Sequence, residues 1–242
     1  MHRFYAPDII ETLILPEEES GHCVRVLRLK EGDEIEVVDG TGKCLRCRIT
    51  LAHHKRCAVE VVEVSEQLPH WGKSIVVAIA PTKNLDRMEW MVEKCTEMGV
   101  DRIVPLRCRY SERKEINEER LRKIAVSAMK QSLKATLPHI EAMMPFATFI
   151  SEEAQRPAMK YVAYCAPEIP RELFAQRYVS GHDTTILIGP EGDFSHEEIT
   201  AAINAGFAPI SLGDNRLRTE PAALVACDTC HIIQQLNTQA IK

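Results

Sequence analysis

The stretch Thr184-Thr-Ile-Leu-Ile-Gly-Pro-Glu-Gly-Asp-Phe194 begins as an uncharged run and passes directly into a glycine-rich turn. An uninterrupted run of this kind is typical of a parallel strand that is covered on both faces. Glycine lets backbone groups approach a ligand closely, and it also serves turns for purely steric reasons. Ser195-His-Glu-Glu198 then matches a capping box and predicts a helix that ends near Gly206.

The same alternation of strand and helix extends outward from this stretch on both sides. Further strands are expected at 74–80, 102–106, 160–165 and 209–212. Further helices are expected at 85–98, with Gly99 as the C-terminal cap, at 118 to about 135, and at 219–236. Strands that alternate with helices predict an α/β domain with a mainly parallel sheet, which we place at residues 71–242.

The N-terminal part of the chain has a different period. Three short alternating runs lie between residues 34 and 64, and Asp39-Gly-Thr-Gly42 between the first two is a turn signal. Short strands joined by tight turns predict a small β-barrel. We therefore expect a separate domain at residues 1–70, with a linker at 65–73.

Charge is distributed unevenly along the 242 residues, although the net charge is −5. Residues 102–134 carry ten Lys/Arg against four Glu, and residues 41–59 carry five basic side chains with no acid. A third basic group, near His22, consists of Arg25, Arg28 and Lys30. Clustered cations in a mildly acidic protein favour RNA binding, although any one cluster is equally consistent with a solvated face.

The chain shows no signal for a membrane, for export or for a metal. No apolar run approaches the roughly 18 residues of a membrane span, and the N-terminus lacks a signal peptide, so we expect a cytoplasmic protein. The nine cysteines then read as reduced thiols. Cys44 and Cys47 would point to opposite faces of a strand. Cys227, Cys230 and His231 match a haem-attachment spacing but fall inside an apolar helix, so no metal or haem is expected.

Three of the predicted strands run into loops of suggestive composition, and ligands of parallel α/β sheets bind beyond the carboxyl ends of strands. These loops are Ala80-Pro-Thr-Lys83, Gly189-Pro-Glu-Gly192 and Ser211-Leu-Gly-Asp-Asn-Arg-Leu-Arg-Thr-Glu220. The sequence contains neither a G-x-G-x-x-G motif nor a P-loop lysine signature, which argues against dinucleotides and nucleoside triphosphates.

Taken together, these loops resemble the SPOUT class of methyltransferases, and within it the RsmE family, which methylates N3 of a uridine in 16S rRNA. Ile188-Gly-Pro-Glu-Gly192, Leu212-Gly213 and Leu217-Arg-Thr-Glu220 carry the resemblance. It extends over essentially the whole chain. Further matching segments are His22-Cys-Val-Arg-Val-Leu-Arg28, Lys94-Cys-Thr-Glu-Met-Gly99, Ser111-Glu-Arg113 and Gln131-Ser132.

The resemblance implies a PUA-like RNA-binding barrel at the N-terminus and a C-terminal α/β domain with a deep trefoil knot. The knot loops would bind S-adenosylmethionine (SAM), 16S rRNA of the 30S subunit would be the substrate, and two copies would form a homodimer. The cofactor-binding residues that it implies are Leu187, Ile188, Gly189, Pro190, Gly192, Leu212, Gly213, Leu217, Thr219 and Ala222.

On the same resemblance, Arg218 would stabilise the negative charge that develops on the uracil, with Arg113 of the partner subunit as a helper. Glu220 is open to three interpretations, namely a residue that orients Arg218, the general base, or a helix cap. Phosphates of the RNA would be contacted by Arg3, Arg25, Arg28, Lys30 and Arg113. His22 is equally consistent with stacking on RNA and with a structural role.

Two positions depart from the family pattern. Pro221 stands where a threonine is common, and the first turn of a helix tolerates proline. Lys134 stands where an arginine is common, so the positive charge is kept but the planar guanidinium fork is lost. Two other functions remain open at this stage. A ribose 2′-O-methyltransferase of the same class would differ in the modified nucleoside, and a non-catalytic RNA-binding or ribosome-assembly factor would not bind the cofactor.

Overall fold

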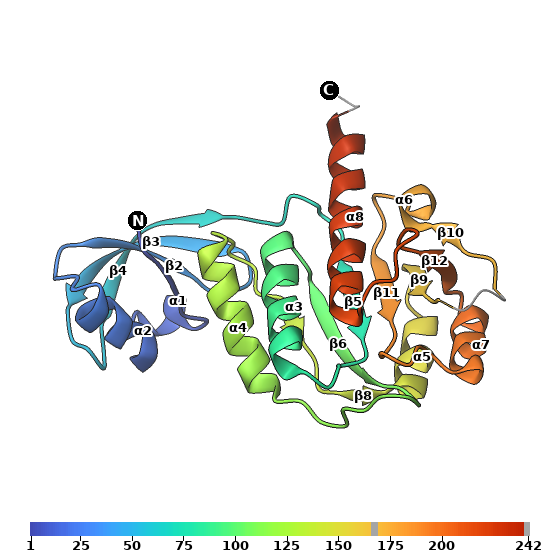
Figure 1. The fold of residues 1–242 in the computed structure, drawn as a ribbon. Helices are drawn as coiled ribbons and strands as arrows, with labels where there is room; N and C mark the ends of the chain where they lie inside the picture. Colours follow the sequence, from blue (N-terminus) through green and yellow to red (C-terminus); the bar gives the residue numbers. More distant parts are fainter. Residues whose placement is uncertain (166–168, 240–242) are drawn as a thin grey trace. The chain divides into compact units, whose positions relative to one another are not determined.

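The computed structural model describes residues 1–165 and 169–239 (Figure 1). The chain folds into two compact units, of which the first comprises residues 1–70 and 126–137. The second unit comprises residues 71–125 and the chain from 138 onward. None of the helices in the described ranges combines the length and apolarity needed to cross a membrane.

The first unit contains a four-stranded sheet in the order β1-β2-β3-β4. Its strands are β1 (Arg3–Tyr5), β2 (Glu34–Val38), β3 (Lys43–Leu51) and β4 (Ala58–Glu66). The β1–β2 pair is parallel and the other two pairs are antiparallel. Asp39 closes the β2–β3 turn, because its carboxylate accepts a hydrogen bond from the Thr41 N–H at 2.8 Å. The predicted N-terminal β-structure is therefore present, as a four-stranded sheet.

Three short helical segments, which the sequence did not predict, lie between β1 and β2. They are α1 (Ile9–Thr12), α2 (Glu17–Gly21) and the π-helix η1 (His22–Val26). Apolar residues of this region pack on one face of the sheet, where Phe4, Leu15 and Leu45 are almost fully buried. The opposite face carries Val38 and Cys44, which cluster with Met129 of the 126–137 segment.

The second unit is built on a parallel sheet, as predicted. Within the described residues, eight strands join it, in the order β10-β12-β9-β11-β5-β6-β7 with β8 beside β6. The strands are β5 (Ile75–Ile79), β6 (Arg102–Arg107), β7 (His139–Ile140), β8 (Met144–Pro145), β9 (Met159–Ala163), β10 (Glu172–Leu173), β11 (Thr184–Ile188) and β12 (Ala208–Ser211). The central strands β5 and β11 are buried along their whole length, which explains their uncharged sequences.

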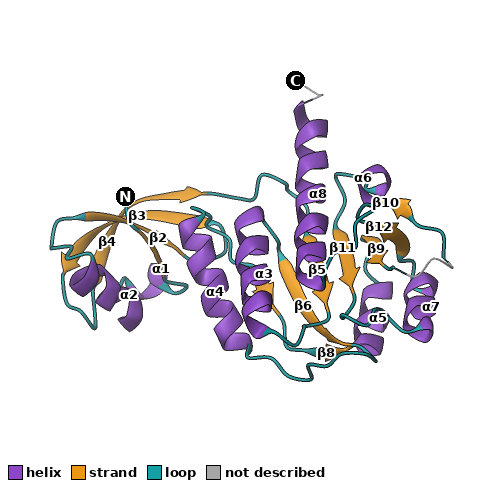
Figure 2. Cartoon of the chain, viewed as in Figure 1, coloured by secondary structure: helices purple, strands orange, loops and turns teal. Residues whose placement is uncertain are grey.

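Helices cover both faces of this sheet. They are α3 (Leu85–Met98), α5 (Phe146–Ala154), α6 (Phe174–Arg177), α7 (His196–Asn204) and α8 (Thr219–Gln239). Helix α4 (Glu118–Gln131) is divided between the two units. Val76 and Ala78 of β5 share a core with α5 and α7. On the other face α3 and α8 pack against each other, and α8 also contacts β5 (Figure 2).

Most helix boundaries follow their sequence signals. The predicted capping box of Ser195 and Glu198 is present at the start of α7, and Gly99 ends α3 with a positive φ of 119°. Several boundaries differ from the predictions by a few residues, as at the end of α8, which continues to Gln239 beyond the predicted 236. Helix α4 ends at Gln131, before the predicted 135, since Leu133 adopts a φ of 56°. Strand β4 continues to Glu66, into the segment predicted as a linker.

Candidate functional site

A deep cleft lies at the carboxyl ends of the parallel strands, where the loops after β5, β9, β11 and β12 meet. Its volume is about 1220 Å³. All three loops singled out in the sequence contribute to its wall. Eight of the ten residues predicted to bind a cofactor line it, namely Ile188, Gly189, Pro190, Leu212, Gly213, Leu217, Thr219 and Ala222.

The other two predicted cofactor residues lie behind the wall of the cleft. Leu187 is completely buried in the core that β11 shares with α5 and α7. Gly192 packs against Tyr110, because a Cβ atom on Gly192 would lie 3.2 Å from the Cβ of Tyr110. Both residues therefore support the loop from behind instead of forming the surface of the cleft.

The two glycines that line the cleft are required for different physical reasons. A Cβ atom on Gly189 would lie 3.2 Å from ring carbons of Phe194, so any larger residue there would force the Phe194 ring to shift. Gly213 has open space around it, but its φ of 116° is a conformation that other residues rarely adopt. Gly213 is exposed where it lines the cleft, so its backbone groups are accessible there.

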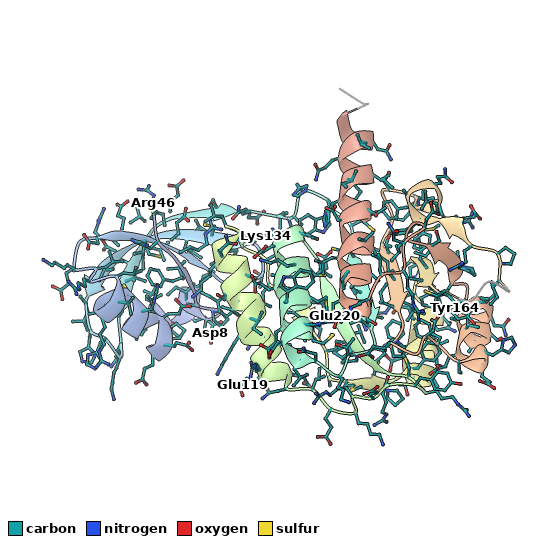
Figure 3. The ribbon with its side chains drawn as sticks, viewed as in Figure 1. Asp8, Arg46, Glu119, Lys134, Tyr164 and Glu220 are labelled. Carbon is teal, nitrogen blue, oxygen red and sulfur yellow. The ribbon has the colours of Figure 1, made fainter. Side chains whose placement is uncertain are left out.

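The first turn of α8 borders the cleft and is tied to two of its loops. The Thr219 hydroxyl donates to the Gly189 carbonyl oxygen at 3.1 Å. The Thr82 hydroxyl donates to Glu220 Oε1 at 2.6 Å, and both of these side chains are buried. Figure 3 shows Glu220 at this end of α8. Pro221 lies in the same turn, where a missing N–H costs no helical hydrogen bond, as predicted.

Arg218, the residue predicted to stabilise developing charge, lines the cleft with an exposed side chain. Arg113 lies just outside, in a smaller hollow of about 550 Å³ that shares Lys83 with the cleft. Its Nη2 donates to the Lys83 carbonyl oxygen at 2.6 Å. Arg113 therefore lies beside the cleft of its own subunit, and its role in the partner's cleft stays a prediction.

Acidic side chains bind the loops of the cleft to one another. Glu191 accepts a hydrogen bond from the Lys83 N–H at 3.1 Å. Asp193, which holds a φ of 64°, accepts from the Cys165 N–H at 3.0 Å. Lys83 and Cys165 follow β5 and β9, so the loop after β11 is fixed from both sides. The roles of Thr82, Glu191 and Asp193 were not predicted, because their partners are distant in sequence.

The residues predicted to contact RNA divide into two groups in the first unit. Arg25, Arg28 and Lys30 are exposed near the π-helix η1, and Arg28 holds a positive φ of 57°. His22 is also exposed and meets the Phe4 ring edge-on at 6.1 Å between centroids. Arg3 differs, because its guanidinium pairs with Glu36 at 3.1 Å and its side chain is only 8% exposed.

The basic run at residues 41–59 is largely neutralised by the fold. Arg46 pairs with Glu34 and Glu63, and Arg48 pairs with Glu34 and Glu60. The acids come from the neighbouring strands β2 and β4, so the run looks uncompensated only in the linear sequence. This stretch is a cross-strand network and contributes less free positive charge than its composition suggested.

The cysteines of the two C-x-x-C pairs lie as predicted. Cys44 and Cys47 belong to the cores on opposite faces of the first sheet, and Cys227 and Cys230 are buried in α8. His231 is also buried, with its Nε2 atom 2.7 Å from the Gly99 carbonyl oxygen. Within 1–165 and 169–239, no three His, Cys, Asp or Glu side chains are grouped as a metal ion would require.

Comparisons with known proteins match both units of the chain. Residues 69–231 match a family model described as an RNA methyltransferase domain, and residues 15–62 match an RNA methyltransferase PUA domain. A curated relative from Synechocystis, named ribosomal RNA small subunit methyltransferase E, is 32% identical, over 91% of this chain and 74% of its own.

Two solved structures resemble the chain over nearly its full length. A probable rRNA methyltransferase from Porphyromonas gingivalis is 46% identical with a TM-score of 0.92, covering 98% of this chain and 100% of its own. A putative methyltransferase from Legionella pneumophila, solved with bound SAM, is 28% identical with a TM-score of 0.83, covering 96% and 97%.

Proposed function

Because this chain belongs to the RsmE family of small-subunit ribosomal RNA methyltransferases, we propose that it methylates N3 of a uridine in 16S rRNA. The enzyme is a SAM-dependent rRNA methyltransferase with a SPOUT-class α/β fold. The observation that carries the finer proposal is the cleft at the carboxyl ends of β5, β11 and β12, which is bordered by the exposed Arg218.

The residues of the cleft fit SAM. Ile188, Leu212 and Leu217 offer apolar surface for an adenine ring, and the bare backbone at Gly189 and Gly213 offers N–H and C=O groups to its polar edge. The volume of the cleft also accommodates a ligand of that size. We expect the loops after β11 and β12 to form the trefoil knot of this class, with Leu187 and Gly192 as its supports.

When bound, SAM supplies a methyl group that is already activated on a sulfonium centre. The task of the protein is then to align N3 of the uridine with that methyl and to favour loss of the N3 proton. The guanidinium of Arg218 would stabilise the negative charge that spreads onto the uracil oxygens as the proton leaves. Arg113 would assist from the rim of the cleft.

We propose that residues 1–70 form the RNA-binding domain and residues 71–242 the catalytic domain. Arg25, Arg28 and Lys30 are the cations proposed to contact RNA phosphates, which would make binding strongly dependent on salt. A π-helix and a positive φ at Arg28 in the same segment support a functional role, because such backbone features concentrate at functional sites. We assign Arg3 to the structure of the unit because Glu36 balances its charge.

We further propose that the enzyme is a homodimer that pairs through α8 and acts in the cytoplasm, where its ribosomal substrate lies. Val225, Ile232 and Leu236 are exposed and follow one face of that helix at spacings of seven and four residues. We expect Ile232→Glu to convert the dimer to a monomer with reduced activity, measured by sedimentation and methyl transfer. A wild-type monomer in sedimentation would contradict this assignment.

Identification of the modified nucleoside tests the proposed function. Small subunits whose 16S rRNA lacks the modification would be incubated with the enzyme and SAM, and the digested RNA analysed by mass spectrometry. The expected product is 3-methyluridine. A 2′-O-methylated nucleoside would instead indicate the alternative activity of this fold class. Absence of any methylated nucleoside from an enzyme that binds both SAM and subunits would indicate a non-catalytic ribosome-binding factor.

A further inference from the structure

Thr82 and Glu220 form a buried pair that links two walls of the cleft. They are 138 residues apart in the sequence, and the hydroxyl oxygen lies 2.6 Å from Glu220 Oε1. Only 3% of Thr82 and 2% of Glu220 is exposed to solvent. A buried carboxylate needs hydrogen-bond donors, and the threonine hydroxyl supplies one.

The single hydroxyl proton of Thr82 determines the direction of this hydrogen bond. The next acceptor, the Asn84 carbonyl oxygen, is 3.4 Å away, so the shorter contact to Glu220 takes the proton. Glu220 Oε1 is therefore an acceptor committed to the protein. A general base must instead present a carboxylate oxygen to the substrate within hydrogen-bond reach, and a residue that is only 2% exposed offers little of its second oxygen, Oε2.

Other carboxylates of the cleft are engaged in the same way. Glu191 accepts from the Lys83 N–H, and Asp193 accepts from the N–H groups of Cys165 and Phe194. Among the described residues that line the cleft, Glu191, Asp193 and Glu220 hold loops in place, whereas the carboxylate of Asp214 lies on an exposed residue. In each case a carboxylate on one segment accepts a hydrogen bond from a donor on another segment, and these bonds hold the loops of the cleft together.

The turn that the pair fixes is the one that carries Arg218. Thr219 is tied to the Gly189 carbonyl oxygen, Glu220 is tied to Thr82, and the Ala222 N–H donates to the Arg218 carbonyl oxygen at 2.9 Å. The backbone of Arg218 is thus held by a turn anchored to the loops after both β5 and β11. Loss of either anchor would loosen the aim of the guanidinium.

We propose that Glu220 is a positioning residue that acts through Thr82 to aim Arg218, and that it is not the general base. This inference rests on the proposed function, in which Arg218 stabilises the uracil anion. The N3–H bond then breaks with its electron pair left on N3, and the proton passes to water. The N3 lone pair forms the new bond to the methyl carbon as the carbon–sulfur bond breaks, and its electron pair returns to sulfur.

Four single variants separate positioning from base catalysis. Glu220→Gln keeps an oxygen that accepts from Thr82, and Thr82→Ser keeps the donor, so we expect both to retain kcat within about fivefold. Glu220→Ala and Thr82→Val remove one partner each, and we expect each to lower kcat by about 10- to 100-fold. Because both break the same pair, the Thr82→Val/Glu220→Ala double variant should be no slower than the slower single variant.

The dependence of kcat on pH is the readout that a purely structural effect would not produce. We expect the same pH profile for wild type, Glu220→Gln and Thr82→Val, because none of these changes alters the proton acceptor. A general base is typically worth about 10²- to 10⁴-fold. If Glu220→Gln is as damaging as Glu220→Ala, or if it abolishes the acidic limb of the profile, the proposal is overturned.

Folding and the proposed function are controlled in the same experiment. Unfolding by urea establishes that each variant is folded, and binding of SAM establishes that the cleft is intact. Wild-type enzyme that forms 3-methyluridine is the reference for all comparisons. Failure of the wild type to form it would contradict the proposed function, whereas equal kcat for Thr82→Val and wild type would contradict only the pairing.

Discussion

The two ends of the parallel sheet in the second unit are built from the same strands, but packed side chains close the amino end whereas the carboxyl end opens into a cleft. At the amino end, Trp71 Nε1 donates to Asp101 Oδ2 at 3.0 Å and its ring packs edge-on against His231. Asp101 also accepts from the N–H of Ile75, the first residue of β5. At the carboxyl end the same strands open into a cleft of about 1220 Å³.

The charged side chains at the two ends of the sheet also differ, because those at the amino end are buried and paired whereas Arg218 at the carboxyl end is exposed. At the amino end, Arg102 is buried and pairs with Glu141 and Glu153, and Thr185 donates to Glu153 at 2.5 Å. At the carboxyl end Arg218 is exposed at the cleft. Paired, buried charges fix the amino end, and an exposed cation is left at the carboxyl end for a ligand. We infer that one end serves stability and the other serves chemistry.

The largest expected effect of a single change is on catalysis at the carboxyl end. We expect Arg218→Ala to lower kcat by about 10²- to 10³-fold, the usual cost of removing a group that stabilises developing negative charge. Because Arg218 is exposed, its loss should change the free energy of unfolding by no more than about 0.5 kcal/mol. Methyl transfer and urea unfolding measure the two effects. Wild-type kcat in a folded Arg218→Ala enzyme would contradict the assignment.

At the amino end the expected effect is on stability. A Cβ atom on Gly99 would lie 2.4 Å from the Trp71 ring, and the φ of Gly99 is 119°. We expect Gly99→Ala to lower the free energy of unfolding by about 2–4 kcal/mol without changing the affinity for SAM. Gly206→Ala is the matched control, because its φ of 90° imposes similar strain in open space. It should cost only about 1 kcal/mol. Equal costs would show that Trp71 does not close this end.

The smallest effect concerns thiol reactivity, which reports exposure at the cleft. Cys165 is exposed and lines the cleft, whereas the other eight cysteines are buried. Burial, together with the nearby Cys44, raises the pKa of Cys47 to about 11. At pH 8, iodoacetamide should therefore label Cys165 first, as measured by peptide mass spectrometry, and saturating SAM should slow that labelling. Labelling of Cys47 at the same rate would contradict the buried assignment.

The sequence predicted those features whose signals are local. The uncharged run at Thr184–Ile188 became β11 with the predicted bounds, and Ser195 and Glu198 formed the predicted capping box. The loops of the cleft were also predicted, because parallel strands bring their carboxyl ends together. The short helices before β2 were missed, since segments of four or five residues carry no helical period.

The contacts that organise the site could not be predicted, because they join residues distant in the sequence. Nothing near Thr82 indicates that its partner is Glu220, and nothing in residues 41–59 indicates that Arg46 and Arg48 face acids on neighbouring strands. The pairing of Arg3 with Glu36 was not predicted either, because it depends on the parallel β1–β2 register. Register and strand order, and not composition, determine which charges stay free.

Titration of the protein with SAM by calorimetry tests the central claim, that the open end of the sheet is the cofactor site. We predict saturable binding by the wild type and by Ala201→Arg, which adds the same side chain on the exposed face of α7. Leu217→Arg places that side chain in the cleft and should abolish binding while the protein remains folded, because Leu217 is only partly buried where it lines the cleft. Absence of binding by the folded wild type, or wild-type affinity in Leu217→Arg, would contradict the account.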